Sequence, residues 1–126
     1  MAFFIVDAKN NKKEIDKANE IIKLWKFNQY ALENGNDSLG FPKEKSKALS
    51  DLFVAIKPNF NNIVNAATAF LDNKKLGIKE KENQELVQII LKNGAVFLEK
   101  MNEIVGQYDK EALEKVTLQS KTEYGI

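Results

Sequence analysis

One stretch of the chain decides the fold, and it reads LVQIILKNGAVFLEKMNEIVGQYDKEALEKV from residue 86 to residue 116. Apolar or small residues recur in it at helical spacing: Leu86, Ile90, Gly94, Phe97, Met101, Ile104 or Val105, Tyr108, Ala112 and Val116. This phase predicts a single helix over about 80–118. At about 1.5 Å per residue, such a helix is roughly 60 Å long, which is more than a compact domain of this size needs. Either the helix breaks at 106–109, with Asp109 capping a short final helix, or it extends into an assembly.

Two further helical patterns precede this stretch. The first predicts a helix that begins near Asn11 and ends before Gly35, with an apolar stripe formed by Ile15, Ala18, Ile22, Trp25 and Leu32. The second keeps one apolar phase on both sides of Pro58, so residues 43–73 are either one kinked helix or two stacked helices. Residues 34–42 are rich in Gly, Asn and Asp and predict a loop, and Gly77 suits a helix C-cap.

These patterns predict an all-α fold. Hydrophobic residues make up 44% of the chain and charged residues 29%, which is ordinary for a folded domain. Helices joined by short loops bury their apolar stripes most simply against their neighbours. We therefore expect residues 1–126 to form one domain, an antiparallel bundle of three to four long helices. A short apolar N-terminal segment, Phe3 to Val6, precedes the first helix pattern.

The composition argues against catalysis. All 19 basic residues are lysines, and the chain has no arginine, no histidine and no cysteine. These residues supply most nucleophiles, proton shuttles and soft metal ligands. Ser46, Lys47 and Ser50 lie close together in sequence, but exposed Ser and Lys in a helix rarely react. The oxygen-rich loop at 34–38 lacks the spacing and closing glutamate of an EF-hand. We expect a protein that is not an enzyme and that has no catalytic residue, no cofactor and no metal site.

Apolar residues outside the main stripes favour a binding function. On the last helix, Ile89 and Val96 are seven residues apart and fall on the side opposite Leu86 and Phe97 in a helical projection. More apolar surface than one small bundle covers indicates self-association or a protein partner. The expected partner-binding residues are Phe3, Phe4, Ile21, Leu24, Trp25, Phe27, Ile89 and Val96. A small accessory subunit, an inhibitor or a virion component from an AT-rich bacterium or its phage fits this pattern.

Two lysine clusters give the alternative function. They comprise Lys9, Lys12, Lys13 and Lys17 near the first helix, and Lys74, Lys75, Lys79 and Lys81 before the last. Lysines contact phosphates, so a helical accessory subunit that touches nucleic-acid backbone is the second hypothesis. A net charge of +1 and interleaved acids, such as Glu14 and Glu80, weaken the local positive field. Protein partners are therefore favoured over nucleic acid.

The location of the protein is also constrained by the sequence. No segment has the roughly 18 consecutive apolar residues that span a bilayer, and Met1 to Asp7 does not resemble a signal peptide. The lack of cysteine fits a reducing compartment. We expect a cytoplasmic protein without a membrane partner.

Overall fold

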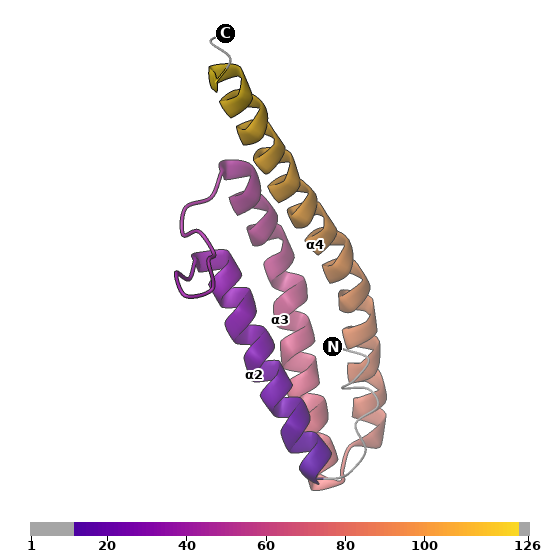
Figure 1. The fold of residues 1–126 in the computed structure, drawn as a ribbon. Helices are drawn as coiled ribbons and strands as arrows, with labels where there is room; N and C mark the ends of the chain where they lie inside the picture. The colour runs from indigo at the N-terminus through magenta and orange to yellow at the C-terminus, as the bar shows by residue number, and fades with distance from the viewer. Residues whose placement is uncertain (1–11, 124–126) are drawn as a thin grey trace.

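The computed structural model describes the backbone of residues 12–123 and the side chains of residues 12–117. Within this range the chain forms three helices, α2 (Lys12–Asn34), α3 (Lys47–Leu76) and α4 (Glu80–Glu123), and no β-strand. Successive helices run in opposite directions, so the predicted antiparallel helical bundle is confirmed, with three helices (Figure 1). Phe3, Phe4 and the Asn11 cap lie outside the described residues.

The end of α2 and the loop that follows are fixed by backbone hydrogen bonds. Gly35 adopts φ +91° and donates its N–H to the Ala31 carbonyl at 2.7 Å, which ends the helix where the sequence predicts. Beyond it, Asn36 and Phe41 exchange two backbone hydrogen bonds of 2.9 and 3.0 Å. The Lys45 ammonium then donates to the carbonyl of Glu33 at 2.5 Å and ties the loop to α2. Burial is the main cause that lowers the pKa of Lys45.

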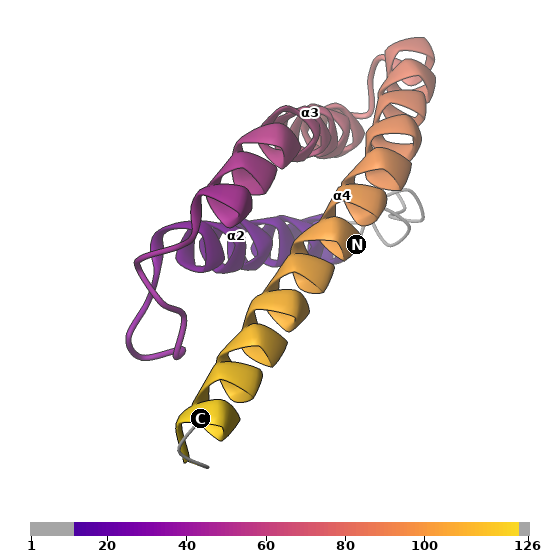
Figure 2. The same ribbon diagram turned by 90° about the horizontal axis from the view of Figure 1, so that it is seen from above.

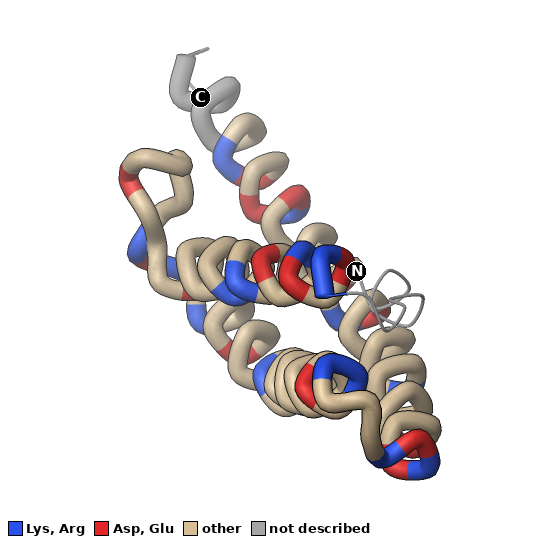
Figure 3. Tube along the Cα trace, turned by 90° about the horizontal axis from the view of Figure 1, so that it is seen from below, with Lys and Arg blue, Asp and Glu red and all other residues tan. Residues whose placement is uncertain are grey.

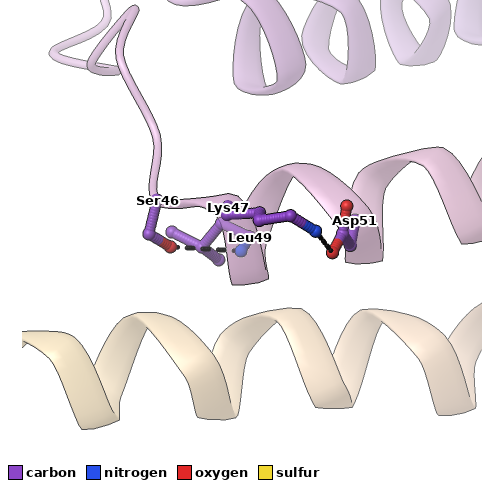
Figure 4. Close-up of polar contacts among 4 residues, drawn as sticks. All are labelled: Ser46, Lys47, Leu49 and Asp51. Carbon is purple, nitrogen blue, oxygen red and sulfur yellow. Dashed lines mark hydrogen bonds and ion pairs between the residues drawn. The ribbon is translucent and has the colours of Figure 1, made fainter.

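Helix α3 begins four residues later than the sequence suggests, at Lys47 instead of residue 43. Ser46 is the N-cap: its backbone is extended, and its hydroxyl accepts the N–H of Leu49 at 3.1 Å. Lys47 pairs with Asp51 one turn on, with 3.0 Å between Nζ and Oδ2 (Figure 4). The Ser46 hydroxyl and the Lys47 ammonium are therefore each engaged in a contact that stabilises the first turns of α3. Loop residues 43–46 are excluded from the helix because the capping geometry at Ser46 requires a non-helical backbone.

Of the two readings of the Pro58 segment, one continuous helix is correct, because α3 contains Pro58 in its interior. At the other end, Gly77 takes the left-handed conformation, with φ 70°, and its N–H reaches the carbonyl of Lys74 at 3.2 Å. The C-cap predicted for Gly77 is confirmed, and α3 continues through residues 74–76 up to this cap.

Helix α4 is continuous from Glu80 to Glu123, so the alternative of a break at 106–109 is wrong. Gly106 is tolerated inside α4 because Ile104 and Tyr108, which flank it, pack in or against the core, and this packing outweighs the modest cost of one glycine. This continuity is also why the bundle has three helices and not four. At the far end, Glu111 of α4 contacts Ser46, which precedes α3, at 2.7 Å. Residues 112–123 therefore run past the start of α3 by about 18 Å (Figure 1).

Helix α3 is the centre of the core, and α2 and α4 both lie along it (Figure 2). It supplies most of the buried apolar side chains, among them Phe53, Ile56 and Leu71. Trp25 of α2 packs edge-on against Phe60 of α3, with 4.7 Å between ring centroids, and against Phe97 of α4 at 5.3 Å. These three rings join all three helices.

Candidate protein interface on the long C-terminal helix

The partner-binding residues predicted on α2 separate into two groups. Leu24 and Phe27 are 60% and 54% exposed, which is consistent with a surface role. Ile21 is half-buried. Trp25 packs against the core cluster through the ring contacts described above, so its side chain stabilises the bundle.

Ile89 and Val96 lie at the edge of the α3–α4 contact. Ile89 lines a shallow depression between these helices together with Asn62, Asn65 and Leu86. Val96 is half-buried. At about 100° per residue, both residues are roughly a quarter turn from Ile90 and Phe97, which face α3. They therefore flank the buried face of α4, although the sequence projection suggested the opposite side of the helix.

An interhelical amide network occupies the same flank of α4. The Asn93 side-chain oxygen accepts hydrogen bonds from Asn59 at 3.1 Å and from Asn62 at 3.2 Å, both on α3. The Lys100 ammonium donates to the carbonyl of Ala55 and to the Asn59 side-chain oxygen, each at 2.9 Å. This flank of α4 is thus held against α3 by polar contacts.

On the other flank of α4, no described residue covers a row of apolar side chains. Each buried residue Ile90, Phe97 and Ile104 is followed immediately by an exposed one: Leu91, Leu98 and Val105. One step along a helix is a rotation of about 100°, so these exposed residues form a stripe a quarter turn from the core. Their exposed fractions are 48%, 65% and 51%, respectively.

This stripe belongs to a longer pattern, which we name the α4 seam. Its residues are all exposed, with spacings that alternate between four and three: Leu91, Ala95, Leu98, Asn102, Val105, Asp109, Ala112 and Val116. Alternation of three and four is the spacing by which one helix packs along another in a coiled coil. The sequence contained this signal, since Leu91, Leu98, Val105 and Ala112 are seven apart. Helical phase alone left open whether Ile104 or Val105 faced the core.

Polar contacts hold α4 where it leaves the bundle. Glu111 accepts hydrogen bonds from Ser46 at 2.7 Å and from Gln107 at 2.8 Å. The bond from Gln107, followed by that from Ser46, lowers the pKa of Glu111. Nearby, burial and then the charge of Glu111 raise the pKa of Tyr108. Tyr108 keeps its hydroxyl buried, and no hydrogen-bond partner for it exists within the described residues.

The fold brings the described lysines of the two clusters to the same end of the bundle, because α2 begins where α3 ends and α4 starts (Figure 3). Acids are mixed with them. Lys74 pairs with Glu80 at 3.2 Å, and Lys79 lies 3.7 Å from Glu82. Lys12, Lys13, Lys17, Lys75 and Lys81 are exposed, and Lys9 is outside the described residues. The end of the bundle is therefore a mixed-charge surface rather than a uniformly basic one.

Three further observations concern membrane spans, metal sites and similarity to known proteins. Among residues 12–123, no helix is long and apolar enough to cross a membrane. The described part of the chain also holds no group of three or more His, Cys, Asp or Glu side chains placed to bind one metal ion. Comparison of the chain with models of protein families, with curated proteins and with solved structures finds no match.

Proposed function

We propose that the protein is a non-enzymatic, cytoplasmic protein-binding module, that the α4 seam is its docking surface, and that the occupant is a second copy of the same chain. The uncovered seam, from residue 91 to residue 116, is the single observation that carries the proposal. Apolar side chains on it expose surface that burial against a partner removes from water.

The seam suits another helix better than a loop or a strand. The alternating spacing of three and four residues lets each seam side chain insert, as a knob, into a hole formed by four side chains of a second helix. Ala95 and Ala112 are small, so a partner backbone approaches closely at both ends of the seam. Asn102 and Asp109 add polar positions, and polar residues at such sites select the orientation of the partner helix at a cost in stability.

Charge favours an antiparallel pair. In a parallel pair, Asp109 would face Asp109 of the second copy, which places like charges together away from water. In an antiparallel pair centred between Asn102 and Val105, Asp109 faces Leu98, Asn102 faces Val105, and Leu91 faces Val116. The two carboxylates are then separated along the pair.

The antiparallel pair also gives the projecting end of α4 something to pack on. Residues 112–123 extend past α3, and Leu113 and Val116 are 66% and 62% exposed. A helical segment of this length is marginal in water without tertiary contacts. In the antiparallel arrangement, it lies along the first turns of α4 in the second copy.

The test is the mass of the purified chain in solution, by light scattering and sedimentation. We expect a dimer of twice 14.3 kDa, and a monomer after Leu98→Lys combined with Val105→Lys. Leu24→Lys with Phe27→Lys, on exposed apolar positions of α2, is the matched control and keeps the dimer. A wild-type monomer at all concentrations overturns self-association, and a dimer that survives the seam variant overturns the choice of surface.

Binding to nucleic-acid backbone remains the second candidate, because the fold places the described lysines of both clusters at the same end of the bundle. A gel-shift titration at low and high salt separates the hypotheses, since phosphate binding weakens steeply as salt rises. With the ion pairs Lys74–Glu80 and Lys79–Glu82 at this end, we expect no shift.

A further inference from the structure

A pocket of about 290 Å³ opens between α2 and α3, away from the α4 seam. Ile56 and Phe60 of α3 and Gln29 and Tyr30 of α2 are among the residues that line it. This volume is close to the lower end of the range of small-molecule sites, which is about 300–1,000 Å³. The pocket therefore has room for a small ligand and not for a large cofactor.

Gln29 is the unusual residue in this pocket. It occupies the position in the apolar stripe of α2 between Trp25 and Leu32, and it is only 8% exposed. Its side-chain amide has no hydrogen-bond partner among the described residues. The amide atoms are not among the buried polar atoms that lack a partner, so they meet solvent where Gln29 lines the pocket. An apolar residue here would continue the stripe, whereas the amide places a hydrogen-bonding group in the pocket, where it is available to a ligand.

The remaining lining defines the chemistry of that ligand. Ile56 is 1% exposed, Phe60 is half-buried, and the ring of Tyr30 stands at the rim with 69% of its surface exposed. Apolar and aromatic walls of this kind favour a flat aromatic group.

Charged lining residues favour an anion. Lys26 and Lys57 line the pocket with Glu33 as the opposing charge. The Lys57 ammonium lies 3.7 Å from the Glu33 carboxylate, a long ion pair on a side chain that is 60% exposed. The balance is one positive charge, which attracts a carboxylate and repels an amine.

We propose that this pocket binds a small aromatic carboxylate. The aromatic ring lies against Phe60 beside Tyr30, and the Gln29 amide N–H donates to the carboxylate. The ammonium groups of Lys26 and Lys57 donate charge-assisted hydrogen bonds to the same carboxylate from the rim of the pocket. The inference does not rest on the proposed dimer, because no seam residue lines the pocket.

The experiment is a titration of the ¹⁵N-labelled full chain, followed through the side-chain amide resonances. The Gln29 resonance is identified by its loss in Gln29→Leu, a variant that keeps the fold because leucine fits the apolar stripe. Benzoate and 2-naphthoate are the probes, and benzylamine and cyclohexanecarboxylate are the controls for charge and for aromaticity. We expect the Gln29 resonance to move with both aromatic acids and to be insensitive to benzylamine.

Variants then separate a built site from a general attraction of anions to lysine. Gln29→Leu should weaken 2-naphthoate binding at least about tenfold, and Lys57→Gln should weaken it several-fold, whereas Lys43→Gln, an exposed lysine outside the pocket, leaves it unchanged. The proposal is overturned if the Gln29 resonance does not move, if benzylamine binds as well as benzoate, or if Gln29→Leu binds equally well. Seam variants that are monomeric still bind the probes, so failure of one proposal is distinguishable from failure of the other.

Discussion

The Ser46 hydroxyl, which caps the first turn of α3, also donates a hydrogen bond of 2.7 Å to Glu111 of α4, 65 positions further along the chain. One side chain therefore sets the start of the central helix and holds the long helix at the point where it leaves the bundle. The N-cap is a local motif, but its second partner exists only because α3 and α4 are antiparallel.

Loss of this hydroxyl should destabilise the fold. We expect Ser46→Ala to lower the free energy of unfolding by about 1 kcal/mol, since the Leu49 N–H loses its acceptor. Urea denaturation measures this change. Ser50→Ala, on an exposed serine one turn into α3, is the control and should change stability by less than about 0.5 kcal/mol. An equal effect of the two substitutions would contradict the capping role.

Glu111 should make stability depend on pH on the acid side. Its pKa in the folded protein is below the ordinary value of 4.5, chiefly through the hydrogen bonds from Gln107 and Ser46. The folded state therefore binds the proton less readily than the unfolded state. The stabilisation is complete above pH 4.5 and is lost as pH falls through the lower folded pKa. Thermal melts across this window should be flatter for Glu111→Gln than for the native chain, whereas Glu114→Gln, on the next turn, should not flatten them.

Cysteine cross-linking reads the orientation of the proposed dimer directly, because the native chain has no cysteine. In the antiparallel register, Leu91→Cys combined with Val116→Cys should form inter-chain disulfides under mild oxidation. Within one chain these positions are about 38 Å apart along α4, too far for a disulfide. Non-reducing gels report the product. Efficient cross-linking of Leu98→Cys alone would instead contradict this register, in which residue 98 faces Asp109 of the second copy.

Substitutions at Trp25 and at its neighbour Leu24 should differ in their effect on stability, because only Trp25 packs against the core. Trp25→Ala removes a ring that contacts both Phe60 and Phe97, so we expect a loss of about 3 kcal/mol or more in unfolding free energy. Leu24, its neighbour, is 60% exposed, and Leu24→Ala should cost less than about 0.5 kcal/mol. Urea denaturation of both variants measures the difference. Equal stability of the two variants would contradict the placement of Trp25 against the core.

Two glycines should respond in opposite directions to alanine. At Gly35, φ is +91° and an added Cβ would be 2.5 Å from the Lys43 Cα, so Gly35→Ala should destabilise the fold. At Gly106, inside α4, nothing lies within 4 Å of the added atom. Gly106→Ala should therefore stabilise the protein by about 0.5–1 kcal/mol. Differential scanning calorimetry of both variants checks the two signs, and a stabilised Gly35→Ala would show that the turn is not constrained.

The helices of this protein are largely determined by local sequence. Helical spacing of apolar residues predicted the extent of α2 and α4 to within a few residues, because periodicity depends on near neighbours in the chain. Gly77 was predicted as a C-cap, although the apolar pattern ended that helix at residue 73 and the structure continues it to Leu76. Residues 43–46 were misassigned to α3 for a related reason. Lysines and a glutamate are compatible with a helix, and the competing cap at Ser46 is a subtler signal.

The candidate surface was less accessible to prediction. Ile104 and Val105 are adjacent apolar residues, and a helical projection of α4 separates them by about 100° without indicating which faces the core. Placement of α3 decided the question, since it buries Ile104 and leaves Val105 51% exposed. The same packing leaves Trp25 half-buried against Phe60 and Phe97.

The sequence by itself determined that this protein is helical and that its chemistry is limited to apolar, hydroxyl, amide, carboxylate and lysine side chains. Only the tertiary structure decided which apolar residues remain exposed, that Gln29 lines a pocket, and that the described lysines of the two clusters lie at the same end of the bundle. The physical reason is that helical periodicity is local, whereas burial depends on which neighbouring helix packs on each face.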